Sequence, residues 1–166
     1  MMKKVMLILI VVLAGKLATG QFYEKHFGVR IGNTTGFSFK AIKNERLGVE
    51  AIIGFRNGGM QVYGMVESYR KIFTSSTDGM RLFFGPGAHA GFTAYRYYNG
   101  YGYYNDSPLR FYPVLGLDAI VGLEYNFPMT PVVIAIDFKP FLELEGFHKF
   151  RANVWDFGIR VSYSIQ

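Results

Sequence analysis

The chain has no cysteine, only six prolines in 166 residues, and no helical spacing of apolar residues beyond its N-terminus. Without cysteine it can form neither a disulfide nor a lipid anchor on an N-terminal cysteine. The missing helical pattern argues against an α-helical domain, and the lack of a linker or low-complexity stretch indicates one domain. Glycine, with 20 residues, and Phe plus Tyr, with 28, are abundant. This composition is typical of β-structure.

The N-terminus has the organisation of a secretory signal peptide. Two lysines precede an apolar run over residues 5–14, and small residues at 18–20 would form the cleavage site. A transmembrane anchor is the alternative, but about ten apolar residues are too few for a helix that needs about 20 to span a bilayer. We therefore expect export, with residues 1–20 removed and residues 21–166 forming the mature domain.

The net charge falls once this leader is set aside. It holds three of the 18 Lys and Arg residues and none of the 12 Asp and Glu residues, so the mature chain carries a net charge of +3. A nucleic-acid-binding protein would need a basic stripe or a recognisable module, and neither is present. We therefore expect no nucleic-acid partner.

The clearest pattern runs from Val114 to Pro140, where apolar and polar residues alternate on either side of a break at residues 128–131. This alternation is that of β-strands with one apolar and one polar face. The first strand is longer than the five or six residues usual in soluble proteins and reaches the roughly 9–11 of a membrane-spanning strand. Asp118 and Glu124 on its polar face would be costly in an apolar core, whereas a lumen accommodates them.

The remaining chain divides into further alternating segments. The eight predicted strands are residues 22–31, 37–42, 47–55, 60–72, 80–94, 114–127, 132–140 and 154–165. With both termini in the periplasm, short turns would lie there and the longer loops 95–112 and 142–151 would face outward, as in bacterial barrels. We predict an all-β fold: an eight-stranded antiparallel up-and-down transmembrane β-barrel. The facing of the strand 60–72 is ambiguous.

Three segments carry a family resemblance: GPGAHAGF at 85–92, GLDAIVGLEYNFPMTPVVIAIDFKP at 116–140, and the last strand. That strand resembles the C-terminal signal of outer-membrane barrels, although Gln166 rather than Phe is last. The mature chain thus resembles small outer-membrane β-barrel proteins of Bacteroidetes-type bacteria. The resemblance implies a Gram-negative outer-membrane location, with outer-membrane lipid and the barrel-assembly machinery as partners. It implies no particular chemistry.

The polar faces of the predicted strands collect charged residues and two histidines. They are Glu24, His26, Arg30, Lys40, Glu50, Glu67, Arg81, His89, Asp118, Glu124, Asp137, Lys139, Asp156 and Arg160. An eight-stranded barrel has an interior just wide enough to be filled by side chains. Opposite charges there should pair, so we predict a lumen closed by a polar network rather than an open, porin-like channel. A proton relay, a metal site or a narrow ion path is the alternative.

The sequence offers little support for catalysis. The three histidines lie on different segments, without the spacing of a nucleophile site or a metal site. We expect no catalytic residue, metal or cofactor, and a non-enzymatic protein. The best rim candidate is His148, near Glu143 and Glu145 in the predicted outer loop, although a solvated loop histidine explains it more simply.

Two alternatives stay open at this point. One is an outer-membrane lipid-modifying enzyme. The other is a soluble exported barrel with its apolar face inward, holding a small apolar ligand, because alternation alone does not tell which face points in.

The predicted outer loop 95–112 is rich in tyrosine, interleaved with glycine and asparagine. It contains Tyr95, Tyr97, Tyr98, Tyr101, Tyr103, Tyr104 and Tyr112. Tyrosine provides rigid contact area with a polar tip, and this composition is favoured in binding surfaces. We therefore consider the loop a candidate binding surface for a glycan or a protein. Flanking tyrosines in an interfacial girdle, with central ones in a self-packed cap, are the simpler alternative.

Overall fold

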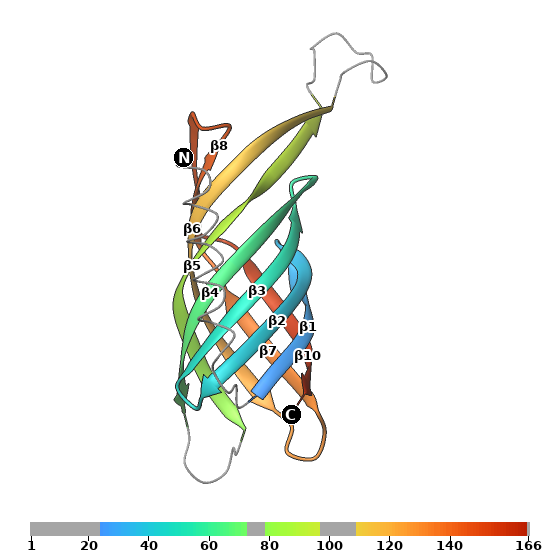
Figure 1. Cartoon of the computed structure of the whole chain (residues 1–166), viewed down its shortest axis with the longest axis vertical. Helices are drawn as coiled ribbons and strands as arrows, with labels where there is room; N and C mark the ends of the chain where they lie inside the picture. The colour runs from blue at the N-terminus through green and yellow to red at the C-terminus, as the bar shows by residue number, and fades with distance from the viewer. Residues whose placement is uncertain (1–23, 73–78, 97–108, 166) are drawn as a thin grey trace, which may run out of the picture.

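The computed structural model describes residues 24–72, 79–96 and 109–165, and every regular element in them is a β-strand (Figure 1). The strands are β1 (Glu24–Gly32), β2 (Thr35–Asn44), β3 (Leu47–Arg56), β4 (Gly59–Lys71), β5 (Met80–Arg96), β6 (Leu109–Asn126), β7 (Val132–Phe138), β8 (Phe141–Glu145), β9 (Lys149–Asn153) and β10 (Phe157–Ile165). The described part contains no helix long and apolar enough to cross a membrane.

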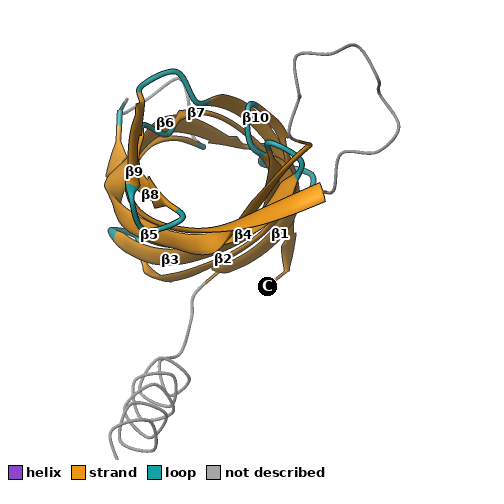
Figure 2. Cartoon of the chain, turned by 90° about the horizontal axis from the view of Figure 1, so that it is seen from above, coloured by secondary structure: helices purple, strands orange, loops and turns teal. Residues whose placement is uncertain are grey.

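The strands close into a ring, which Figure 2 shows from above. Neighbours along the chain pair antiparallel from β1 to β7, and β10 pairs with both β7 and β1 to complete the circle. β7 and β8 both pair with β6 and form one interrupted wall strand; β9 pairs with β8 and leads into β10. The structure therefore confirms the predicted eight-stranded antiparallel barrel.

The pairing register sets the size of the barrel. The chain of paired residues that starts at Gly28 on β1 and passes through β2, β3, β4 and β5 ends at Gly116 on β6. The chain of paired residues that starts at Gly28 and passes the other way, through β10 and β7, ends at Asn126 on β6. The two end points are ten residues apart, and this offset is the stagger of the strands around the ring. With ~3.3 Å per residue and ~4.8 Å between strands, this stagger tilts the strands by about 40° and gives a backbone radius of about 8 Å. Such a radius leaves room for side chains only.

Apolar and charged side chains separate cleanly between the two sides of the wall. Outward positions carry large apolar residues that are exposed in the isolated chain, for example Phe27 at 50% and Ile159 at 56%. Inward positions alternate with them and carry charged residues, aromatic residues and glycine. On β4 the facing is resolved as well, because Tyr63 and Met65 are buried whereas Val62 and Val66 are about half exposed.

Tight turns connect the strands at several points. The β3–β4 turn has Asn57 and Gly58 at φ values of 51° and 68°, as expected for an Asn-Gly hairpin whose two central residues both take positive φ.

The prediction that residues 142–151 form a loop is wrong. Residues 141–145 and 149–153 form the hairpin β8–β9, which turns at Gly146–His148 and extends beside β6 at the end of the barrel opposite the C-terminus (Figure 1). The chain passes through Pro140 without losing its inside–outside alternation, because the Pro140 carbonyl still accepts a bond from the Ala119 amide at 3.0 Å. β5 and β6 are also longer than predicted, and β10 begins at Phe157 rather than at residue 154.

Candidate functional site

The candidate site is the barrel interior, where all fourteen predicted polar residues have their side chains. Twelve of them are buried, several completely, such as Arg30, Glu67 and Lys139. Glu24 and Arg81, at the end of the barrel that holds the C-terminus, keep 11% of their side chains exposed. These residues come from every wall strand, and they meet because the strands face a common axis.

One group of ion pairs lies near the end of the barrel that holds the C-terminus. Arg81 bridges Glu24 and Glu124, with N–O distances of 3.0 and 2.7 Å. Lys40 lies between Glu124, at 3.1 Å, and Glu67, at 3.0 Å. His26 adds a contact of 2.8 Å from its Nε2 to Glu24. Acids and bases thus alternate across five strands of the wall, β1, β2, β4, β5 and β6.

A second group fills the middle of the barrel. The Arg160 guanidinium contacts Glu50 at 2.7 Å and Asp137 at 3.1 Å. Arg30 donates to the same Asp137 at 2.6 Å and to Asp156 at 3.1 Å. Two arginines therefore share one carboxylate, which links three wall strands that are neighbours in the ring.

A third group lies toward the opposite end. Lys139 contacts Asp156 at 2.9 Å and Asp118 at 3.6 Å. The His89 ring lies between two carboxylates, with Nδ1 2.7 Å from Asp118 and Nε2 3.2 Å from Glu143. The His89 ring is thus held between two acids, one at each ring nitrogen.

Glycines on the inner face make room for these side chains. A Cβ atom added at Gly158 would collide with the Arg30 guanidinium, and one added at Gly116 would collide with the His89 ring. The inward glycines thus let long or planar groups lie against the backbone.

Three charged inner residues were missed from the sequence: Arg56, Glu143 and Glu145. The sequence predicts a turn at Arg56 and a loop around the two glutamates, yet all three residues are buried. Arg56 pairs with Glu143 at 2.5 Å, and Glu145 accepts a bond from Thr93 at 2.7 Å. The available signal was the alternation of FLELE at residues 141–145, which continues that of β7.

His148 lies on the β8–β9 turn and is exposed, whereas Glu143 and Glu145 point into the barrel. The two predicted acids of the rim site are therefore engaged in the interior. No group of three potential metal ligands occurs within residues 24–72, 79–96 and 109–165.

The space between the ion pairs is occupied by apolar and aromatic groups. Ile42, Ile52, Tyr63 and Phe83 are completely buried. The Lys40 ammonium lies 4.3 Å from the centre of the Phe83 ring, which adds cation–π attraction. Ion pairs surrounded by such groups close the interior, as the calculated radius requires.

The interior holds more acid than base. Eight carboxylates are buried in the described part, against five lysine or arginine side chains and two histidines. Glu50 and Glu67 lie next to one another, which joins the first two groups of ion pairs. Because like charges in contact repel, such neighbouring acids are costly unless they share a proton or contact a base.

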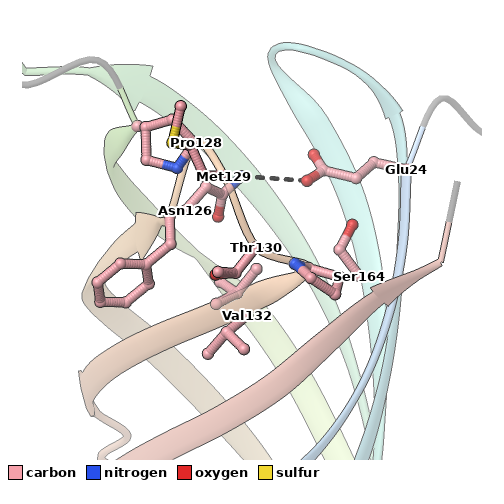
Figure 3. Close-up of a pocket in the computed structure, with 11 residues that line it drawn as sticks. Glu24, Asn126, Pro128, Met129, Thr130, Val132 and Ser164 are labelled. Carbon is pink, nitrogen blue, oxygen red and sulfur yellow. Dashed lines mark hydrogen bonds between the residues drawn. The ribbon is translucent and has the colours of Figure 1, made fainter.

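A pocket of about 560 Å³ opens at the end of the barrel where β6 turns into β7. It is lined by the turn residues Phe127–Pro131, by Glu24 and by Ser164 (Figure 3). Asn126 donates to the Glu24 carboxylate across it at 3.0 Å. The pocket belongs to the mouth of the barrel and reaches the first group of ion pairs.

Two other predictions fall mostly on residues that the structure does not describe. The proposed signal peptide, 1–20, lies outside the described residues, as do Tyr97, Tyr98, Tyr101, Tyr103 and Tyr104 of the predicted binding loop. Tyr95 belongs to the end of β5, where its backbone pairs with Arg110 of β6.

Comparison with known proteins shows similarity of fold but not of sequence. No family model and no curated protein matches the sequence. Among solved structures, the chain is similar to the N-terminal β-barrel domain of Pseudomonas aeruginosa OprF, with 12% sequence identity and a TM-score of 0.48. The match covers 86% of this chain and 96% of that one.

Proposed function

We propose that this protein is a non-enzymatic outer-membrane β-barrel with a side-chain-filled lumen and a structural or surface-interaction role. The observation that supports it is the inverted polarity of the closed ring. Large apolar side chains point outward from every wall strand, while most described carboxylates are buried inside. A continuous apolar surface of this kind aggregates in water and is stable against lipid.

The dimensions agree with a lipid-facing wall. At the calculated tilt, the nine residues of β1 or β10 cover about 20 Å along the barrel axis, near the ~25 Å height of the apolar band in outer-membrane barrels. The outward side chains of β10 are apolar over this whole length, from Phe157 to Ile165. A soluble carrier of an apolar ligand would need the opposite facing, because its ligand would meet the ion pairs of Arg30 and Arg160.

The orientation follows from the lengths of the connections. We place both termini in the periplasm, together with the short β2–β3 and β6–β7 turns. The extended β5–β6 and β8–β9 hairpins then face the outside (Figure 1). In this orientation the tyrosine-rich stretch 95–112 lies at the cell surface, where we propose that it contacts a glycan or a protein. Unchanged cell or glycan binding after replacement of its central tyrosines by serine would contradict this role.

The membrane assignment is tested by electrophoresis in SDS of boiled and unboiled protein from outer-membrane fractions. A folded transmembrane barrel resists SDS until it is heated, so we expect two mobilities. A protein that fractionates with the soluble periplasm and shows one mobility would contradict the proposal.

A matched pair of variants sharpens this test. Ile136 is 54% exposed in the middle of the wall, and Thr130 is exposed on the β6–β7 turn. An arginine at an exposed site of a soluble protein is usually harmless, whereas at the bilayer midplane it costs about 2–4 kcal/mol. We expect Ile136→Arg to lose the SDS-resistant band at a lower temperature and Thr130→Arg to behave as the parent does. Equal behaviour of the two variants would refute lipid contact.

A further inference from the structure

Exposed basic side chains gather at the end of the barrel that holds the C-terminus. They come from β1, β2, the β2–β3 turn and β4, and they are Lys25, Lys43, Arg46, Arg70 and Lys71. These elements are consecutive neighbours in the ring, and the Tyr69 amide donates to the Arg46 carbonyl at 2.8 Å, which places Arg46 beside Arg70. We call this set the basic crescent.

Carboxylates of the described residues do not neutralise the crescent. Among the described acids only Glu45 is exposed, and it pairs with Lys71 at 3.1 Å. The other acids are directed into the interior, where they pair with inner bases. Within the described residues, therefore, Lys25, Lys43 and two arginines have no carboxylate partner.

The crescent borders directly on the apolar wall. Lys25 is two residues from outward Phe27 on β1, and Arg46 is followed by outward Leu47 on β3. Long basic side chains at such a border lie with their stems along apolar surface and their charges in the headgroup layer. This position suits an anionic lipid, whereas a soluble polyanion would gain nothing from the adjacent apolar surface.

The opposite side of the same barrel end has a different character. The β6–β7 turn, residues 127–131, contains no charged residue, and its Met129 side chain is 97% exposed. In the described part of this rim, positive charge is therefore concentrated on the β1–β4 side.

We propose that the basic crescent binds the phosphate headgroups of anionic glycerophospholipids in the leaflet at this end of the barrel. This inference rests on the proposed function, because it requires the apolar wall to stand in a bilayer. Clusters of four or more Lys and Arg residues beside a membrane attract anionic lipid, and each basic residue adds to the binding free energy. The ligand class is thus a phospholipid with net negative charge, and phosphatidylglycerol is a suitable probe.

The test uses folded full-length mature protein in non-ionic detergent, with native mass spectrometry to count bound phosphatidylglycerol against phosphatidylcholine. We compare the parent with Lys25→Gln/Lys43→Gln/Arg46→Gln/Arg70→Gln and with Arg46→Gln/Arg70→Gln. The matched control is Arg110→Gln/Lys149→Gln, which removes the same number of charges as the double variant at the other end of the barrel.

We expect the parent to prefer phosphatidylglycerol, and this preference to weaken with salt. It should fall about tenfold or more in the quadruple variant, by less in the double variant, and remain in the control. No preference in the parent, or an equal loss in the control, would overturn the inference. Displacement of the lipid by millimolar inorganic phosphate would also overturn it, because the crescent would then be a site for free phosphate.

The two proposals fail in different ways. A protein that fractionates as soluble and shows no heat-dependent mobility contradicts the membrane barrel itself. A protein with the normal mobility shift but no lipid preference leaves the barrel intact and refutes only the crescent.

Discussion

Removing the Arg160 guanidinium should destabilise the barrel more than any surface change. Arg160 lies 2.7 Å from Glu50, and removing one partner of a buried charged pair is strongly destabilising because the other group is left without compensation. Asp137 keeps Arg30 at 2.6 Å when Arg160 is absent, so Glu50 is the acid left without its arginine. Uptake of a proton by Glu50 limits the loss, and we expect Arg160→Met to cost about 3–5 kcal/mol.

The measurement is the free energy of unfolding in urea of protein folded into phosphatidylcholine vesicles, followed by the heat-dependent mobility shift. The double variant Glu50→Gln/Arg160→Met removes both charges and should recover at least half of the loss, because no buried charge is then unpaired. Arg70→Met, at an exposed position, serves as the control and should change stability by less than about 0.5 kcal/mol. A cost below about 1 kcal/mol for Arg160→Met, or no recovery in the double variant, would refute the reasoning.

Three further predictions concern packing, depth in the membrane and backbone strain. Gly158→Val should lower the free energy of unfolding by about 1–3 kcal/mol in the same urea assay, because the valine side chain would displace the Arg30 guanidinium. Gly64→Ala has open space around the new atom and should be neutral, so equal costs of the two variants would contradict this prediction. Trp155, the only tryptophan, lies just before the start of β10 and so near the edge of the apolar wall. Its fluorescence should be quenched more by lipids brominated near the headgroup than by lipids brominated near the chain end, and the reverse order would place Trp155 deeper. Phe147 has a φ of 62°, a backbone conformation that is strained for phenylalanine and not for glycine. Phe147→Gly should therefore stabilise the β8–β9 hairpin and slow its amide hydrogen exchange, and faster exchange would contradict this prediction.

Much of the wall could be predicted from the sequence because a period of two assigns every residue of a strand to one of two faces. Asp118, Glu124 and Asp137 were assigned to the inner face on this basis, and all three are buried. The same rule does not place Glu143, because a proline such as Pro140 commonly ends a strand. Proline removes one ladder donor, but it does not reverse the alternation, and the chain continues along β6.

The contacts inside the barrel could not be predicted from alternation. Alternation gives the facing of Lys40 but not its height, and its partners Glu67 and Glu124 are fixed by the ten-residue stagger around the ring. That stagger is a property of eight pairings taken together. A single strand carries no sign of it, so the partner of each charge becomes known only when the ring is closed.

The charged interior also explains how the sequence specifies one register. An apolar outer face alone is satisfied by lipid at any register, because every large apolar side chain there meets the same surroundings. The central group is different, since Arg30, Asp137 and Arg160 come from three adjacent wall strands and fit together in one alignment. A slip of one residue in β10 would turn Arg160 to the apolar outer face, which costs about 2–4 kcal/mol in the proposed membrane setting, and would leave Glu50 without its partner. We infer that the buried ion pairs select the register of the wall, even where apolar residues of similar size would fill the interior equally well.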